Sequence, residues 1–216
     1  MEKPKKRRPT LKEIFTDKRL ALMLALGFSA GLPLLLVFST QSAWLRTVGI
    51  DRASIGLMSY VALAYAFKFL WAPIVDGYDP PLLARWLGRR RGWMMLAQFG
   101  VVVGLIGIAF GDPVNALMWT VVCALFVAFS SATQDIVIDA WRIDAAPSEQ
   151  QGMMVATYSL GYRFGMLAAG AGALYMADFF SWKAAYLAMG SLMAIGMIAC
   201  ILSPRIERQV EAPKQA

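Results

Sequence analysis

The feature that most constrains this chain is a series of long apolar runs, each of about the length that crosses a bilayer. Roughly 20 apolar residues in a helix span the hydrocarbon core, and six such runs follow one another with short connections. This pattern predicts an all-α integral membrane protein with six transmembrane helices and no separate soluble domain. The predicted spans are residues 20–44, 53–75, 93–111, 114–141, 152–177 and 183–203.

Composition and charge agree with a chain that lies in lipid. Hydrophobic residues make up 58% of the sequence and charged residues 16%, against about 45–50% and 25% in soluble proteins. A net charge of +7 would suggest a nucleic-acid partner for a soluble protein. Here the basic residues flank the apolar runs, where they act as topology signals. We therefore expect a lipid bilayer as partner and no nucleic acid.

The two ends of the chain are predicted to be polar. Residues 1–19 form a basic segment, and three apolar positions within it share one helical face, which indicates a short interfacial helix. The run that follows is longer than the core of a signal peptide, about 7–15 residues, so we interpret it as a membrane span. Residues 204–216 are predicted as a polar tail. The interfacial face consists of Leu11, Ile14 and Phe15.

Orientation follows from the distribution of Lys and Arg. Sixteen of the 21 basic residues fall in the two ends, the 76–92 loop and the 142–151 loop. The other loops hold three, and two lie within spans. Cytoplasmic loops carry the excess of Lys and Arg. Both termini are therefore predicted to be cytoplasmic.

Several site chemistries are disfavoured. The sequence has no histidine, and its two cysteines, Cys123 and Cys200, both lie in apolar runs. This excludes a disulfide framework and a zinc site of the usual kinds. No nucleophile motif is present, so an integral-membrane enzyme is the weakest interpretation. We expect neither a metal nor a cofactor.

Four charged residues lie away from the ends of the predicted spans, where charge is costly and marks functional candidates. Lys68 and Asp135 lie at a similar depth, roughly 10–12 Å from the cytoplasmic ends of their spans. Asp139 is nearer that end, and Arg163 lies nearest the midplane, about 18 Å deep. Asp135 could pair with Lys68 or with Arg163. The alternative is that these groups form structural ion pairs that never change protonation.

The fourth span has a polar stripe and an opposite apolar face. The stripe repeats every three or four residues and places both acids on one side of the helix, which we interpret as the interior side. It consists of Ser131, Asp135, Asp139 and Arg142. The face interpreted as lipid-exposed consists of Val122, Phe126, Phe129 and Val137.

Other spans carry patterns of their own. Gly27 and Gly31 allow a close helix contact, and Pro33 is expected to kink the first span. In the fifth span, small residues from Gly161 to Gly172 form a stripe. In the second span, Tyr65, Lys68 and Trp71 share a face suited to a sugar ring or a carboxylate. The alternative is a snorkelling lysine with interfacial aromatics.

These residues resemble a known family. Asp76 followed by the Gly88–Gly92 run resembles the loop motif between spans two and three of the major facilitator superfamily. Four further runs are similar to the AmpG-type muropeptide permeases within it, and acetyl-coenzyme A transporters are relatives with a similar fourth-span motif. The runs are residues 28–33, 67–73, 131–140 and 161–163.

The resemblance implies a proton-driven importer of anhydromuropeptides, which are sugar-peptide fragments of the cell wall, in the inner membrane of a bacterium. The proton gradient would be its energy source. It also implies two groups of site residues. A cytoplasmic gate would consist of Asp76, Arg89, Arg90, Asp139 and Arg142. The substrate and proton pathway would consist of Lys68, Gln134, Asp135 and Arg163, and we add Tyr65 from its position beside Lys68.

The resemblance covers only the N-terminal six-helix half of a major facilitator fold, in which the substrate lies between two halves. We therefore expect a second six-helix half, from another chain or from a homodimer partner. Two alternatives stay open. The chain could be a truncated or split half that acts only as a membrane assembly module, or a transporter of the acetyl-coenzyme A type.

Overall fold

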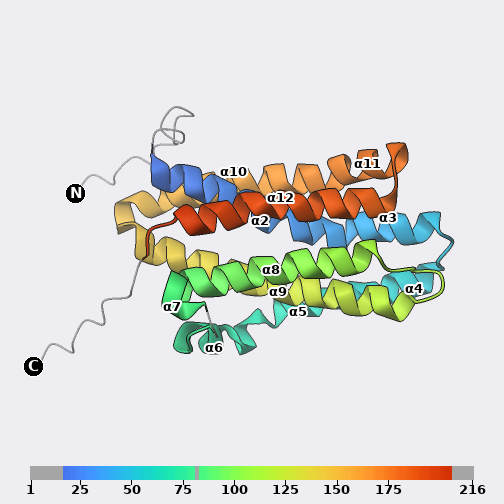
Figure 1. The fold of residues 1–216 in the computed structure, drawn as a ribbon, viewed down its shortest axis with the longest axis horizontal. Helices are drawn as coiled ribbons and strands as arrows, with labels where there is room; N and C mark the ends of the chain where they lie inside the picture. The colour runs from blue at the N-terminus through green and yellow to red at the C-terminus, as the bar shows by residue number, and fades with distance from the viewer. Residues whose placement is uncertain (1–16, 81–82, 206–216) are drawn as a thin grey trace, which may run out of the picture.

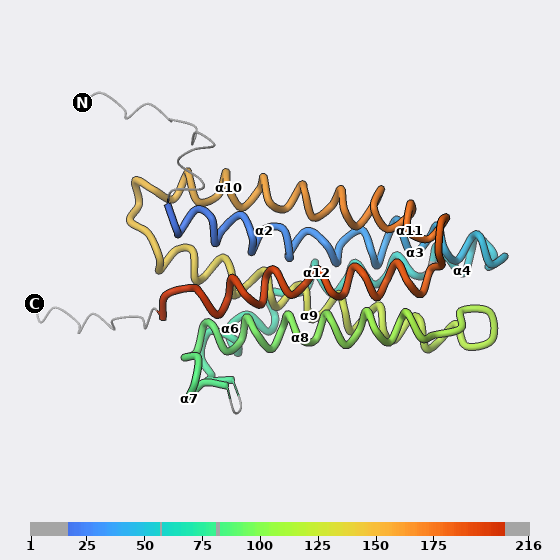
Figure 2. Tube along the Cα trace, turned by 45° about the horizontal axis from the view of Figure 1, so that its top comes forward, coloured from blue at the N-terminus to red at the C-terminus, as the bar shows by residue number. Residues whose placement is uncertain are grey.

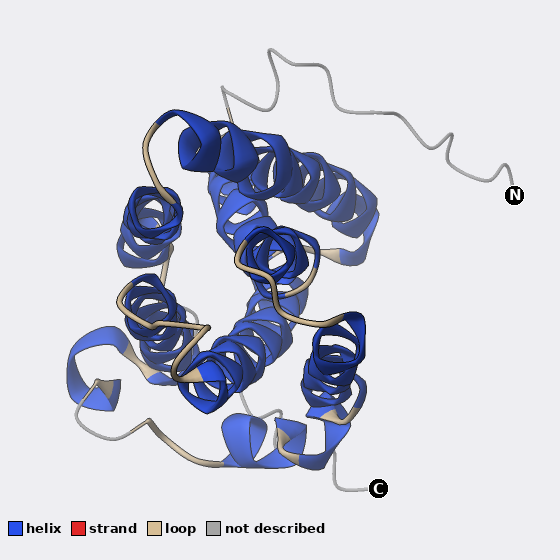
Figure 3. Cartoon of the chain, turned by 90° about the vertical axis from the view of Figure 1, so that its right-hand side faces the viewer, coloured by secondary structure: helices blue, strands red, loops and turns tan. Residues whose placement is uncertain are grey.

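A computed structural model describes residues 17–80 and 83–205. Within these residues the chain is all-helical, as predicted, and a view along its long axis shows helices joined by short loops (Figure 3). Both ends of the described chain lie at the same end of the bundle (Figure 1), which we call the terminal end. The predicted interfacial helix and most of the predicted polar tail lie outside the described residues.

The first apolar run forms two helices, α2 (Lys18–Val37) and α3 (Ser39–Thr47). The carboxylate of Asp17 caps α2 by accepting a hydrogen bond from the backbone N–H of Arg19. Pro33 lies inside α2, and the interruption falls instead at Phe38, where φ is −113° and ψ is −87°. The helix therefore continues past the proline, which removes a single N–H donor, and breaks further along.

The second run is not the continuous helix that we expected. Little of it packs against the bundle, and side chains such as Phe69 and Leu70 are exposed. Because most helical stability in proteins comes from packing of one face, this segment alternates between short α and 3₁₀ turns. The elements are α4 (Arg52–Leu57), η1 (Met58–Val61), α5 (Ala62–Ala66), η2 (Lys68–Leu70) and α6 (Ala72–Gly77), with α7 (Ala84–Leu87) after them.

Three long helices are uninterrupted: α8 (Arg89–Ala109), α9 (Leu117–Ala145) and α12 (Trp182–Leu202). Gly88 joins α7 to α8 with φ of +77°, a left-handed conformation that favours glycine. The indole N–H of Trp119 donates to the carbonyl of Gly107 at 2.9 Å and ties the start of α9 to α8.

The fifth run forms α10 (Ser148–Leu167), a π-helical turn η3 (Ala168–Gly172) and α11 (Ala173–Phe179) without a break in the chain direction. A π turn departs from the regular α pattern of backbone hydrogen bonds. The hydroxyl of Thr40 in α3 donates to the carbonyl of Ala169 at 2.7 Å. The irregular turn is therefore held by a side chain from the first run.

The tightest helix contact is between α2 and α10, which lie side by side along much of their length (Figure 2). A Cβ atom at Gly27 or Gly31 would collide with the carbonyl of Tyr158 or Tyr162, respectively. Conversely, a Cβ atom at Gly161 or Gly165 would collide with a carbonyl of α2. The two small-residue stripes predicted from the sequence therefore meet each other, as such stripes do in membranes.

The core is organised around α2, which contacts α10, α12 and α9. Toward the terminal end it packs with residues such as Trp141 and Met154, and toward the opposite end with residues such as Leu105 and Tyr186. The hydroxyl of Tyr186 donates to the carbonyl of Leu36 at 2.8 Å, just before the interruption at Phe38. A fully buried hydroxyl in this apolar region is thereby satisfied.

Five helical stretches are long and apolar enough to cross a membrane. The remaining predicted span, the fifth in chain order (152–177), coincides with α10, η3 and α11, which are long enough but carry more polar residues, among them Arg163. With both chain ends at one end of the bundle, the helices traverse it an even number of times, as six spans require. The five stretches are Lys18–Thr47, Arg52–Leu70, Arg89–Ala109, Leu117–Ala145 and Trp182–Leu202.

Candidate functional site

A cluster of one arginine and two acids lies at the terminal end of the bundle. The guanidinium of Arg90, at the start of α8, forms an ion pair with Asp76 at the end of α6. Its Nε also donates to the carboxylate of Asp144 in the last turn of α9, at 3.3 Å. The Arg90 side chain is only 9% exposed. This Arg90 cluster joins α6, α8 and α9.

A second group, on α9 and α10, is separate from the Arg90 cluster. Arg142 forms an ion pair with Asp139 at 3.4 Å and donates from Nη1 to the side-chain oxygen of Gln151 at 2.8 Å. The amide nitrogen of Gln151 in turn donates to the carbonyl of Ala146 at 2.7 Å. Gln151 therefore satisfies backbone groups that the end of α9 leaves open. Four of the five predicted gate residues thus fall into two groups.

Arg89 joins neither group. Among the described residues, no carboxylate lies within ion-pairing distance of it. Arg91 donates from Nη2 to the carbonyl of Ile201 at 2.7 Å and so ties α8 to the end of α12. The three consecutive arginines, which look alike in the sequence, therefore have different surroundings.

The middle of the bundle holds the predicted pair of opposite charges. Asp135 is partly buried on α9 and accepts a hydrogen bond at 3.3 Å from the hydroxyl of Tyr158 on α10. Lys68 of η2 lies near enough to act on this carboxylate through space. No ion pair of 4.0 Å or less joins Asp135 to Lys68 or Arg163 in the described part of the chain. The partner that hydrogen-bonds Asp135 is thus a tyrosine.

The aromatic face predicted around Lys68 is only partly assembled. The indole N–H of Trp71 donates to the hydroxyl of Thr133 on α9 at 3.1 Å, and its ring lies 4.6 Å from that of Phe129. The hydroxyl of Tyr65 is buried near Ser131 but makes no hydrogen bond of standard geometry. Trp71 therefore serves to attach this loosely packed segment to α9.

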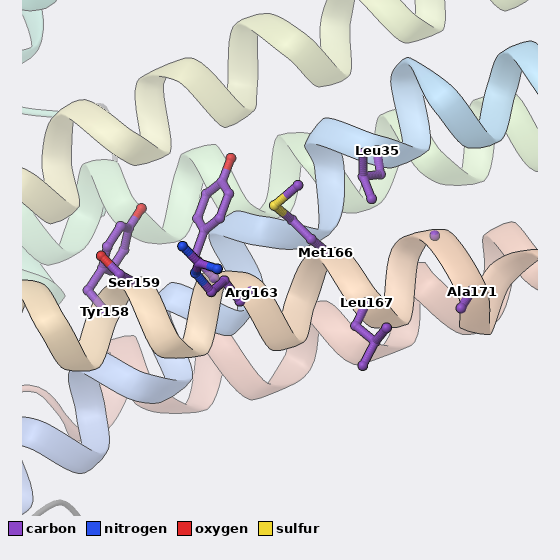
Figure 4. A pocket seen from close by; sticks show the side chains of 9 residues that line it. Leu35, Tyr158, Ser159, Arg163, Met166, Leu167 and Ala171 are labelled. Carbon is purple, nitrogen blue, oxygen red and sulfur yellow. The ribbon is translucent and has the colours of Figure 1, made fainter.

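A groove of about 850 Å³ runs along the outward side of α10. Arg163 lies exposed in its middle, with Tyr158 and Ser159 one turn toward the terminal end and Met166 on the other side (Figure 4). Leu35 of α2 closes one wall. The groove thus combines a cation, tyrosine rings and an apolar surface, which suit a ligand with a carboxylate and a ring.

Gln134 lies elsewhere. It is fully buried, and its amide nitrogen donates to the hydroxyl of Ser29 on α2 at 3.1 Å. The hydroxyl of Ser29 donates to the carbonyl of Leu26. The structure therefore places Gln134 in the helix packing between α9 and α2, and not among the residues that line the α10 groove.

The polar stripe of α9 is only partly an interior face. Ser131 is buried, whereas 57% of the Asp139 side chain is exposed. On the opposite face Phe126 and Phe129 are exposed, as predicted, but Val137 is fully buried. That prediction was wrong because Val137 lies at the level where α2, α9 and α12 converge into one core cluster.

Sequence reasoning missed three residues that the structure brings into these groups: Asp144, Gln151 and Tyr158. Asp144 is an acid three residues after the predicted fourth span, and the 76–92 loop, predicted on the same side of the membrane, holds four arginines. Tyr158 precedes Tyr162 by one helical turn, on a helix already marked by Arg163. In the described chain, no group of three or more Cys, Asp or Glu side chains is placed to hold a metal ion.

The assembled helices and paired charges define a multi-pass membrane protein with a polar groove. The sequence model of the Major Facilitator Superfamily matches residues 20–216. The chain therefore belongs to this superfamily, whose members are transporters and not enzymes. The fold class predicted from the sequence, part of a major facilitator fold, is confirmed.

Particular relatives sharpen this assignment. The chain is 42% identical over 202 residues to the anhydromuropeptide permease of Escherichia coli. The aligned region covers 93% of this chain and 40% of that protein. The chain is 38% identical over 191 residues to the putative transporter AmpG 4 of Rickettsia felis, covering 88% and 46%, respectively. The chain thus spans less than half the length of these relatives. The resemblance to AmpG-type permeases is confirmed.

Proposed function

We propose that this chain forms the first half of a proton-driven importer of anhydromuropeptides or related sugar-peptide fragments in a bacterial inner membrane, with both termini cytoplasmic. The observation that carries the proposal is the exposed guanidinium of Arg163 in the α10 groove, near mid-length of a membrane-spanning helix. An unpaired charge at that depth is costly. A carboxylated substrate would form a charge-assisted hydrogen bond with it.

The surface of the described bundle supports a second half. Besides Arg163, the outward side of α10 and the segment 52–77 expose large apolar side chains, including Phe164, Leu167, Phe67 and Leu70. A polar groove flanked by apolar side chains suits a contact with protein more than with lipid alone. A second six-helix half, supplied by another chain or by a copy of this one, would enclose the groove as two-half transporters do.

The charged groups at the terminal end fit a gate. The Arg90 cluster links three helices, and the group around Arg142 links two. Such ion pairs can hold one end of a bundle closed and separate when the helices move. We propose that Asp76, Arg90 and Asp144 form the core of a cytoplasmic gate, with Asp139 and Arg142 beside it.

The first test is binding. The 216-residue chain in lipid nanodiscs should bind N-acetylmuramic acid, a carboxylated amino sugar. Replacing Arg163 by Ala should weaken binding about 10- to 100-fold, the range expected for losing a hydrogen bond to a charged group of about 1.5–3 kcal/mol. Replacing Ser159 by Ala, a neutral change in the same groove, serves as the matched control. Equal affinity of the Arg163 and Ser159 variants would remove the groove from the proposal.

The second test is transport. Proteoliposomes would contain the chain alone or together with the remaining part of the E. coli relative, and uptake of labelled anhydromuropeptide would be followed with and without an imposed proton gradient. Gradient-dependent uptake in the paired sample supports the proposal. Binding without uptake in both samples favours an assembly module, and uptake of acetyl-coenzyme A instead favours the related transporter class.

A further inference from the structure

The side chain of Tyr158 contacts both the α10 groove and the carboxylate of Asp135. Its side chain lines the α10 groove beside Arg163 (Figure 4), and its hydroxyl donates to the carboxylate of Asp135 on α9 at 3.3 Å. We propose that Tyr158 is a positioning residue that couples the charge of Asp135 to the binding of a carboxylated ligand in the groove. This inference rests on the proposed function, because it assumes that the groove binds such a ligand.

The hydrogen bond from Tyr158 to Asp135 is one of few contacts between α10 and α9. The helix packs mainly on α2 and touches α9 at few points. Within the described chain, the side-chain hydrogen bonds between α9 and α10 are those of Gln151 at the terminal end and that of Tyr158. Asp135 itself does not line the groove. The Tyr158 side chain therefore connects the groove with this acid.

The chemistry of the pair follows from its donors and acceptors. An ionised carboxylate only accepts, so Tyr158 must direct its single O–H toward Asp135. When Asp135 takes up a proton from water, the carboxyl group gains an O–H and can donate to the phenolic oxygen. The tyrosine hydrogen is then free to turn into the groove and donate to a ligand carboxylate. Tyr158 stays neutral throughout, and no bond other than the new O–H of Asp135 forms.

Other charged and titratable groups also lie near Asp135. They come from the segment 52–77, from α9 itself and from α10. Lys68 carries a charge opposite to that of the Asp135 carboxylate, and Asp139 carries the same charge. In the described part of the chain, the other tyrosines near this carboxylate do not donate a hydrogen bond to it and so have no donor to release when it becomes neutral. These groups are Lys68, Asp139, Tyr65 and Tyr162.

The test compares two tyrosines of the same groove. Binding of N-acetylmuramic acid to the full chain in nanodiscs is measured between about pH 5.5 and pH 8, where the carboxylate of the probe stays ionised. The unmodified chain should bind several-fold more tightly at the acidic end. Tyr158→Phe should lose this acid-dependent gain, whereas Tyr162→Phe should keep it. An unchanged gain in Tyr158→Phe, or an equal loss in both variants, would overturn the proposal.

A variant of Asp135 and its combination with Tyr158→Phe complete a double-mutant cycle. In Asp135→Asn the amide N–H₂ donates to the phenolic oxygen, as the protonated carboxyl group would. This variant should bind the probe at both pH values as the unmodified chain does in acid, and adding Tyr158→Phe should remove that advantage. If the two substitutions act independently on affinity, the coupling does not exist.

A measurement without ligand separates this inference from the proposed function. Infrared spectra of the chain with ring-labelled tyrosine report whether a tyrosine hydroxyl donates or accepts a hydrogen bond. Acidification should change this signal in the unmodified chain and in Tyr162→Phe, but not in Tyr158→Phe or Asp135→Asn. Absence of the change in the unmodified chain would overturn the inference even if the probe binds. If the infrared signal changes on acidification but the probe does not bind, the groove is not a ligand site. The coupling between Asp135 and ligand binding would then be refuted as well.

Discussion

The carboxylate of Asp76 and the guanidinium of Arg90 form an ion pair across the loop that joins the second and third predicted spans. They lie fourteen positions apart in the sequence, and the short helix α7 and the left-handed Gly88 lie between them. The pair is asymmetric, because the Arg90 side chain is 9% exposed and that of Asp76 is 48% exposed. Asp144 supplies the second, more buried carboxylate.

This arrangement predicts that Arg90 is important for stability. Arg90→Ala should lower the free energy of unfolding by about 2 kcal/mol, between the values for exposed and buried ion pairs, because two carboxylates lose their shared cation. Denaturant unfolding in detergent micelles measures the change. Arg85→Ala, at an exposed position on α7, should change stability by less than about 0.5 kcal/mol. Equal effects of the two substitutions would contradict the assigned role of the Arg90 cluster.

Much of this architecture follows from local sequence patterns. Runs of about 20 apolar residues fix where the long helices lie, and glycines spaced by four indicate where two helices approach closely. Both depend only on residue type and helical period, so Gly27, Gly31 and Gly161 could be assigned a packing role in advance. Asp76 and Arg90 could be joined because the family motif names both.

The remaining features depend on contacts that sequence periodicity does not encode. The π turn at 168–172 is held by Thr40, 129 residues away from Ala169. The short turns of the segment 52–77 reflect its sparse packing. Pairing of Asp135 with Tyr158 requires the relative rotation of α9 and α10, which neither helix sets alone. The sequence places Gln134, one residue from Asp135, in the predicted pathway, and the contact of its buried side chain with Ser29 of α2 likewise depends on how two helices pack.

The glycine contact between α2 and α10 predicts a steric penalty. Gly31→Ala should destabilise the chain by about 1–3 kcal/mol, the range for overpacking, because the new Cβ would collide with the backbone carbonyl of Tyr162. Gly172→Ala is the matched control, since nothing lies within 4 Å of a Cβ at that position. Thermal unfolding of both variants in nanodiscs checks the difference. Comparable stability of the two would show that α2 and α10 do not pack as closely as described.

The hydrogen bond from Thr40 to the π turn predicts a local effect. Thr40→Val keeps the shape of the side chain but leaves the buried carbonyl of Ala169 without this donor, at a cost of about 1–3 kcal/mol. Hydrogen exchange should therefore become faster in residues 168–173 than in α10. Thr47→Val removes a more exposed bond to the carbonyl of Trp44 and should leave this region unchanged. An equal change of exchange in η3 and in α10 in the Thr40 variant would mean that the π turn does not need Thr40.

The loop before α4 predicts a pH dependence outside the membrane spans. Hydrogen bonds from the side chain and the backbone N–H of Ser54 lower the pKa of Asp51 below its ordinary value. Asp51 caps the start of α4 through these hydrogen bonds. Because its pKa is lower in the folded state than in the unfolded state, this cap stabilises the fold fully above the ordinary pKa of about 3.9. The stabilisation is lost as the pH falls through the lowered pKa of the folded state. Amide exchange of residues 52–57, corrected for its intrinsic pH dependence, should show constant protection from neutral pH down to about pH 4 and a decline below it. Asp51→Asn, which keeps an accepting side-chain oxygen but cannot titrate, should flatten this profile, and a decline that persists in this variant would assign it to another group.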